Sequence, residues 1–112
     1  MKDETKIQND IRVALSELGF VRRNNVGKFL TLNGVPISVG IKGESDLTLF
    51  MRGGEAVFIE TKTARGRQSK EQRHFQQVVE KLGYKYIIMR SRDDAERFLE
   101  RIKNERKGKR TD

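Results

Sequence analysis

The sequence predicts a single α/β domain with a central mixed sheet flanked by helices, in the order α-β-β-β-α-β-α. Segments with apolar residues at helical spacing alternate with short runs rich in β-branched and aromatic residues, which favours this class. The length of 112 residues fits one small domain with a modest core. We assign residues 1–104 to this domain and residues 105–112, which are rich in basic residues, to a mobile tail.

The first expected helix covers residues 3–18. Its apolar face carries Ile7, Ile11, Leu15 and Leu18. Gly19 follows as a helix stop, and Glu4 falls on the apolar face, so we expect the Glu4 carboxylate to point towards the core. Two interpretations of Glu4 stay open: a favourable interaction with the helix dipole, or an additional carboxylate over the candidate site described below.

Strands are expected at residues 20–26, 28–32 and 35–39. Asn33-Gly34 is a strong signal for a type I′ hairpin turn between the second and third of these segments. Pro36 indicates an edge strand or an irregular one, because proline cannot donate to a strand ladder.

A second hairpin brings two acidic residues together. Gly43-Glu44-Ser45-Asp46 leads into a strand at residues 47–51, and Arg52-Gly53-Gly54-Glu55 forms a turn into a strand at residues 56–62. The hairpin can therefore place Asp46 beside Glu60 in one cleft.

Glu60 and Lys62 lie on the same face of their strand, because side chains alternate along it. Two carboxylates and a nearby backbone carbonyl can supply the hard oxygen ligands that Mg²⁺ takes. Lys62 could then orient or deprotonate an attacking water, or neutralise developing charge. The alternative is a solvated strand face or a cross-strand ion pair, and the hairpin favours the site over it.

Basic residues surround this motif. We predict contacts with the phosphates of a ligand from Lys42, Arg65, Arg67 and Lys70. The first lies between glycines that precede Asp46, and the others lie in or just after a loop at residues 63–68. The alternative for this loop, a solvated connection between strand and helix, is left equally open.

Ser69 and Gln72 form a capping box that starts a helix ending near Leu82. Gln72 either serves only as the cap partner or points into the cleft beside Lys62. His74 lies nearly opposite the apolar stripe of this helix and is not a candidate catalytic base.

Residues 84–89 are expected to form a strand parallel to the Lys62 strand, because a helix connects the two. Ser91 caps a last helix at about residues 93–103.

The net charge is +8, from 24 Lys and Arg against 16 Asp and Glu, and it favours a polyanionic partner, with nucleic acid ahead of anionic membranes. The chain has no cysteine and one histidine, so any metal must be held by oxygens. No stretch approaches the roughly 20 apolar residues of a membrane span, and the N-terminus lacks a signal-peptide core. We therefore expect no membrane association and a cytoplasmic protein.

The order of these motifs resembles the PD-(D/E)xK nuclease superfamily, and more narrowly the small stand-alone VRR-NUC proteins of phages and bacteria. The residues that carry the resemblance are Glu4, Gly43, Asp46, the segment from Phe58 to Lys62, Gly66, Ser69, Gln72, Phe75, Gly83 and the segment from Ile87 to Met89. Ser45 stands where the family usually has proline, and Phe75 where a tryptophan is common. Neither departure removes a ligand.

The resemblance implies a restriction-endonuclease-like core and a Mg²⁺- or Mn²⁺-dependent DNA endonuclease that leaves a 5′-phosphate. Asp46, Glu60 and the Thr61 carbonyl would bind the metal, Lys62 would act on the attacking water, and Glu4 and Gln72 would complete the site. It also implies a homodimer acting on branched DNA such as Holliday junctions, in the cytoplasm of a bacterial host cell, encoded by the host or by a phage. The alternatives are a non-catalytic basic nucleic-acid-binding module and a nickase or endonuclease of unbranched DNA.

Overall fold

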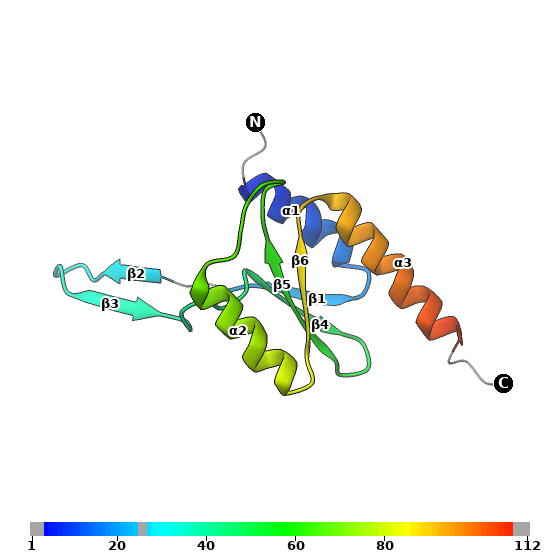
Figure 1. Cartoon of the computed structure of the whole chain (residues 1–112). Coiled ribbons are helices and arrows are strands. Elements are labelled where there is room, and N and C mark those ends of the chain that lie inside the picture. The colour runs from blue at the N-terminus through cyan, green and yellow to red at the C-terminus, as the bar shows by residue number, and fades with distance from the viewer. Residues whose placement is uncertain (1–3, 25–26, 109–112) are drawn as a thin grey trace.

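The structure is a computed structural model that describes residues 4–24 and 27–108 (Figure 1). Its elements are α1 (Glu4–Leu15), β1 (Gly19–Arg23), β2 (Gly27–Leu30), β3 (Pro36–Val39), β4 (Leu47–Met51), β5 (Ala56–Thr61), α2 (Lys70–Lys81), β6 (Lys85–Met89) and α3 (Arg92–Gly108). The predicted α/β class is confirmed. β2 and β3 form a separate two-stranded sheet, and the other elements follow the predicted order. Within the described ranges, no helix is long and apolar enough to cross a membrane.

The main sheet has the strand order β1-β4-β5-β6 and is mixed. β1 pairs with β4, and β4 with β5, in antiparallel orientation. β5 and β6 are parallel, as predicted, because α2 carries the chain from one end of the sheet back to the other. The glycine-rich turn between β4 and β5 is also confirmed, with Gly53 and Gly54 both at positive φ.

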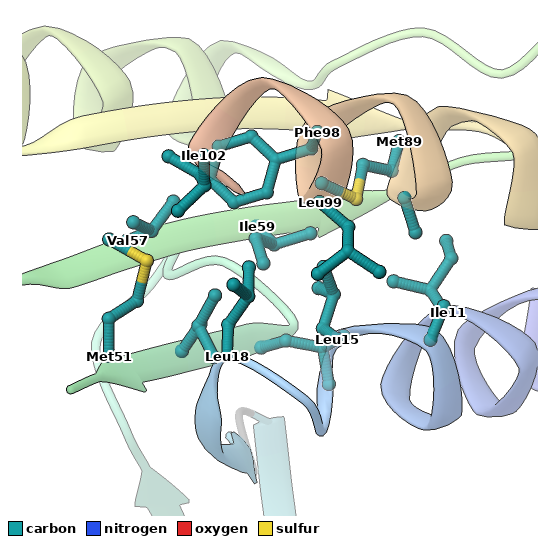
Figure 2. Close-up of a cluster of buried hydrophobic side chains, with 14 of the residues drawn as sticks. Ile11, Leu15, Leu18, Met51, Val57, Ile59, Met89, Phe98, Leu99 and Ile102 are labelled. Atoms are coloured by element: carbon teal, nitrogen blue, oxygen red, sulfur yellow. The ribbon is translucent and has the colours of Figure 1, made fainter. Parts of the chain in front are cut away.

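One face of the sheet packs against α1 and α3 and forms the main core (Figure 2). The fully buried members of this core include Ile11, Leu15, Leu47, Leu49, Val57, Ile59 and Met89. Phe98, Leu99 and Ile102 cover them from α3, as Figure 2 shows. The odd-numbered residues of β4 and β5 therefore face this core, which leaves the even-numbered ones for the opposite face.

The opposite face of the sheet is covered by α2. Phe75 and Val79 of this helix are buried against Phe58 and Tyr86. The Phe58 and Phe75 rings meet edge to face with their centroids 5.4 Å apart, a favoured aromatic geometry. This packing fixes the first turn of α2 over the end of β5.

The hairpin formed by β2 and β3 is confirmed, but its predicted type I′ turn is wrong. That turn needs positive φ at two central residues, whereas in the described ranges only glycines have positive φ, and here it is Gly34. The Gly34 amide donates to the Thr31 carbonyl at 2.9 Å, and the Thr31 amide to the Val35 carbonyl at 2.9 Å. The connection is therefore a longer loop with its single left-handed residue at Gly34.

The predicted ends of the first and last helices are also wrong. α1 stops at Leu15 because Ser16 and Leu18 form tight turns, and the Ser16 hydroxyl donates to the Val13 carbonyl at 2.7 Å. Gly19 is not a helix stop: it begins β1, where a Cβ would lie 2.0 Å from the Phe50 carbonyl oxygen.

α3 continues to Gly108 instead of ending near residue 103. Residues 105–108, assigned to the tail, are therefore helical. The Arg106 guanidinium donates to the Arg52 carbonyl at 2.8 Å, and the Lys85 ammonium lies 3.9 Å from the Glu105 carboxylate. The rest of the predicted tail, residues 109–112, lies outside the described residues.

Candidate active site

Asp46 and Glu60 lie side by side at one end of the main sheet. The antiparallel register pairs Leu47 with Ile59, so the residue before β4 lies next to the penultimate residue of β5. The Asp46 amide donates to Glu60 Oε1 at 3.2 Å. The predicted convergence of the two carboxylates is therefore present in the fold.

The Asp46 carboxylate is held by Thr61. Asp46 Oδ2 accepts from the Thr61 amide at 2.9 Å and from the Thr61 hydroxyl at 2.8 Å. Thr61 is fully buried, and its hydroxyl oxygen accepts from Gln8 Nε2 at 3.5 Å. Gln8 is only 7% exposed, and its Oε1 has no hydrogen-bond partner within the described residues. A polar chain thus runs from α1 through β5 to Asp46.

Glu60 is 1% exposed and faces three polar groups. Its Oε1 accepts from the Asp46 amide, its Oε2 accepts from Gln72 Nε2, and Lys62 Nζ lies 3.5 Å from Oε2. Burial, and then the negative charge of Asp46, raise the pKa of Glu60 to about 7, although Lys62 acts in the opposite direction. An ionised Glu60 is thus unfavourable here unless further positive charge is supplied.

Gln72 acts both as the cap partner and as a contact of the site. Its side-chain Oε1 accepts from the Ser69 backbone amide at 2.8 Å, while the Gln72 backbone amide donates to the Ser69 hydroxyl at 3.1 Å, which completes the capping box. The same side chain uses Nε2 to reach Glu60. The cap and the site are therefore one structure, and the two interpretations of Gln72 are compatible.

Lys62 lies just after β5, with a side chain that is 14% exposed. Its backbone amide donates to the Met89 carbonyl at 3.1 Å, which extends the parallel pairing with β6 by one residue. Gly66 lies against its side chain, since a Cβ on Gly66 would be 3.3 Å from Lys62 Cδ. The predicted alternation holds: Lys62 and Glu60 meet on one face.

The basic loop at residues 63–68 is held by Arg90, which the sequence did not indicate. Arg90 Nη1 donates to the carbonyl oxygens of Thr63, at 2.8 Å, and Gly66, at 2.7 Å. Arg65 and Arg67, like Lys70 in the first turn of α2, are exposed. Their guanidinium and ammonium groups can thus meet a ligand while the backbone between them stays fixed.

The approach to Asp46 is held from both sides. The side-chain Nδ2 of Asn24 donates to the Ser45 carbonyl at 3.0 Å, and the backbone amide of Asn24 donates to the Asp46 carbonyl at 2.8 Å. Gly43 has φ +83°, and a Cβ there would lie 2.3 Å from the Glu71 carbonyl oxygen. Lys42 is exposed, with its ammonium 3.5 Å from the Glu71 carboxylate.

Glu4 differs from its predicted position. It is an exposed residue in the first turn of α1, so the expectation that it points towards the core is wrong. Burial on that face of α1 begins with Ile7 and Gln8, and Gln8 is the polar residue that reaches the site. The sequence signal for Gln8 was a lone amide on an apolar helical face, and sequence reasoning did not select it.

The side chains at this end of the sheet fit a hard divalent cation in part. Among the residues that the structure describes, no group of three or more His, Cys, Asp or Glu side chains is arranged to hold a metal. Asp46 and Glu60 offer two carboxylates, and the raised pKa of Glu60 is the electrostatic situation that a cation relieves. Mg²⁺ commonly takes one or two carboxylates and completes its coordination with water and phosphate oxygens.

The chain is similar to known proteins in both sequence and fold. Residues 36–93, a little more than half of the chain, match the family model described as "VRR-NUC domain". A solved structure titled "VRR_NUC domain" is 20% identical in sequence, with a TM-score of 0.64 over 87% of this chain and 94% of the other. At this identity the likeness shows the fold alone. A search of curated proteins gave no match.

Proposed function

Because the chain belongs to the VRR-NUC family of the PD-(D/E)xK nuclease superfamily, we propose that it is a metal-dependent DNA endonuclease. The observation that carries the proposal is the convergence of Asp46, Glu60, Lys62 and Gln72 at one end of the sheet. A purely structural hairpin has no need to set a buried carboxylate, Glu60, beside the half-buried Asp46 and a lysine.

Asp46, Glu60 and the carbonyl of Thr61 would hold a Mg²⁺ or Mn²⁺ ion. When bound, this ion would supply Lewis-acid stabilisation of the phosphate and of the nucleophile. Thr61 keeps the Asp46 carboxylate oriented through two hydrogen bonds, and Gln72 does the same for Glu60.

Lys62 acts on the nucleophile. Its side chain is only 14% exposed and its ammonium lies 3.5 Å from Glu60, so it can orient a water and offset the charge that develops on the phosphate. The water would attack phosphorus and release a proton, the bond from phosphorus to O3′ would break, and the leaving O3′ would take up a proton, which gives a 5′-phosphate and a 3′-hydroxyl. Because Lys62 is fixed by Gly66 on one side and Glu60 on the other, its position is set before DNA binds.

DNA would lie across the loop at residues 63–68 and the start of α2. Arg65, Arg67 and Lys70 are exposed there and would contact phosphates, and Lys42 would join them by leaving its ion pair with Glu71. The substrate we propose is branched DNA such as a Holliday junction. A homodimer would make two cuts across such a two-fold symmetric junction.

The test is a panel of labelled four-way, flap, bubble and linear DNAs with Mg²⁺ or Mn²⁺. We expect cleavage of branched substrates by the wild type, and a loss of about 100-fold or more in Asp46→Asn and Lys62→Ala. Arg97→Ala is the matched control, because this exposed arginine of α3 pairs with Asp94 and contacts no site residue in the described chain. Full activity in both site variants would overturn the proposal.

Metal binding can be measured without turnover. Mn²⁺ should raise the melting temperature of the wild type, because a ligand that binds only the folded state stabilises it by about 2.7 kcal/mol at 100 times its Kd. Asp46→Asn should show a much smaller shift. An equal shift in both proteins would mean that Asp46 is not a ligand.

The second candidate is a non-catalytic module that binds nucleic acid through its cations. The +8 charge and the exposed Arg65 and Arg67 favour it. It would bind DNA in a salt-dependent manner, show no cleavage with any divalent ion, and bind equally well after Asp46→Asn.

A further inference from the structure

The β2–β3 hairpin is the part of the fold with the least support from its own chain. We call residues 27–39 the arm. In Figure 1 the arm projects away from α2 and the main sheet, and within the described residues its strands pair only with each other. A two-stranded hairpin alone is at best marginally stable in water, so the arm needs a further surface.

The side chains of the arm are of the kind that such a surface would cover. Leu30 is 72% exposed, Leu32 is 107% exposed, and Val35 and Ile37 are also exposed. The only charged residue of the arm is Lys28, near its base, and residues 30–37 contain none. An arm built to bind DNA phosphates would carry lysine or arginine towards its tip, so the composition favours a protein partner.

The body of the same chain offers a matching surface. A groove of about 580 Å³ lies between α2 and the face of β4 and β5 that α2 covers. Its lining includes the buried Phe75 and Val79, and the exposed Phe50, Val78, Leu82 and Tyr84. Phe20 stacks on Phe50 with the ring centroids 6.1 Å apart and extends this apolar area onto β1. Contiguous exposed apolar surface of this kind marks an interaction site.

The arm cannot fill the groove of its own chain in the observed fold. Ile41 and Lys42, which follow the arm after Gly40, line the rim of the groove. The base of the arm therefore lies at the groove, and the loop at residues 31–35 that joins β2 to β3 lies at the far end of the arm (Figure 1). Left-handed glycines at Gly40 and Gly43 set the direction in which the arm leaves.

We propose that the apolar arm of one copy docks in the groove of a second copy, and that the exchange is reciprocal. Each chain carries one arm and one groove, so a single two-fold axis satisfies both and the assembly closes as a dimer. This proposal deepens the homodimer of the proposed function by naming the surface that holds it. It rests on that function only for the homodimer, because the groove lining contains none of Asp46, Glu60, Lys62 and Gln72, although Lys42, a proposed DNA contact, lies at its rim.

Sedimentation velocity, without DNA or divalent metal, tests the contact. We expect a wild-type dimer, and a dimer dissociation constant at least about tenfold higher in Leu32→Ser and in Val78→Ser. Both positions are exposed, so the folded monomer should tolerate each change, which circular dichroism would check. Val13→Ser is the matched control, because Val13 is 62% exposed on α1 and lines neither arm nor groove.

Cysteine cross-linking places the contact directly, because the chain has no native cysteine. A mixture of Leu32→Cys and Val78→Cys should form a disulfide-linked heterodimer on mild oxidation. The same mixture with Val13→Cys in place of Val78→Cys should not.

Any of the following results would overturn the proposal: a monomeric wild type, a dimer that both serine variants leave unchanged, or a Leu32→Cys protein that links equally to both partners. Loss of DNA binding in Leu32→Ser without any change in sedimentation would instead assign the arm to nucleic acid and would also overturn it. Asp46→Asn should dimerise like the wild type, so failure of the nuclease proposal and failure of this one are distinguishable.

Discussion

The end of β5 and the arm distribute polar and apolar side chains in opposite ways. Glu60 and Thr61 are almost completely buried at the end of β5, whereas Leu30 and Leu32 on the arm are largely exposed. A buried carboxylate and an exposed apolar patch are both unfavourable in an isolated domain. The proposed partners differ accordingly: a cation for the end of β5, and a second copy of the chain for the arm. Both proposed functional regions thus lie where ordinary burial preferences are not met.

The largest expected effect is the loss of cleavage activity on substitution of Gln72. Gln72→Ala removes the amide that holds Glu60, and loss of such a supporting contact lowers activity by about 10- to 100-fold. Ser69→Ala removes only the cap, which costs about 1 kcal/mol of stability and leaves the Glu60 contact in place. Cleavage rates and denaturant unfolding of both variants separate the two roles. Equal rate losses would show that Gln72 acts only through the helix start.

The second expected effect concerns the buried polar chain. Thr61→Val removes the hydroxyl that serves both Asp46 and Gln8, and leaving buried groups unpaired costs about 1–3 kcal/mol. Gln8→Leu removes an amide whose Oε1 has no partner in the described chain, so its effect on stability should be much smaller. Urea unfolding of the two variants measures the difference. A larger loss in Gln8→Leu would contradict the expected order.

The third effect is the pH dependence of stability in the metal-free protein. Between pH 4.5 and about 7, folded Glu60 holds a proton that the unfolded chain has released, so rising pH favours unfolding. The contribution of Glu60 should fall by about 1.4 kcal/mol per pH unit across this window. Because other carboxylates titrate too, the measurement is the difference in unfolding free energy between wild type and Glu60→Gln in EDTA. A difference independent of pH would show that Glu60 titrates normally.

The smallest effect is expected on the arm. Leu30→Ser and Val35→Ser change side chains that are already in water, so each should shift the unfolding free energy of the monomer by less than about 0.5 kcal/mol. Thermal unfolding at a concentration below the dimer dissociation constant measures this. A loss of stability similar to that of Thr61→Val would mean that the arm packs on its own chain, so that its apolar side chains would not be exposed.

Much of the site could be predicted because its signals are local. Strand alternation places Glu60 with Lys62, a glycine turn returns the chain to Asp46, and a capping box marks Gln72. The contacts of Gln8, Asn24 and Arg90 could not be predicted. Two of these side chains donate to backbone carbonyls, which every residue has, and Gln8 meets a residue far away along the chain.

The wrong predictions have equally physical causes. The turn at Gly34 and the end of α1 depend on which of several closely similar hydrogen-bond patterns the chain adopts, and residue preferences do not separate these patterns. α3 continues to Gly108 because residues beyond its last apolar residue, Ile102, contact other elements. Glu105 pairs with Lys85 of β6, and Arg106 donates to the Arg52 carbonyl in the turn after β4.

The double role of Gln72 also makes completion of the site depend on the formation and packing of α2. The β4–β5 hairpin brings Asp46 and Glu60 together through contacts that are short in sequence. Gln72 reaches Glu60 only after α2 has formed its first turn and crossed over the sheet. A chain still emerging from the ribosome, or one whose α2 has frayed, therefore carries an incomplete site. Under the proposed function, DNA cleavage would therefore depend on the packing of α2 on the sheet.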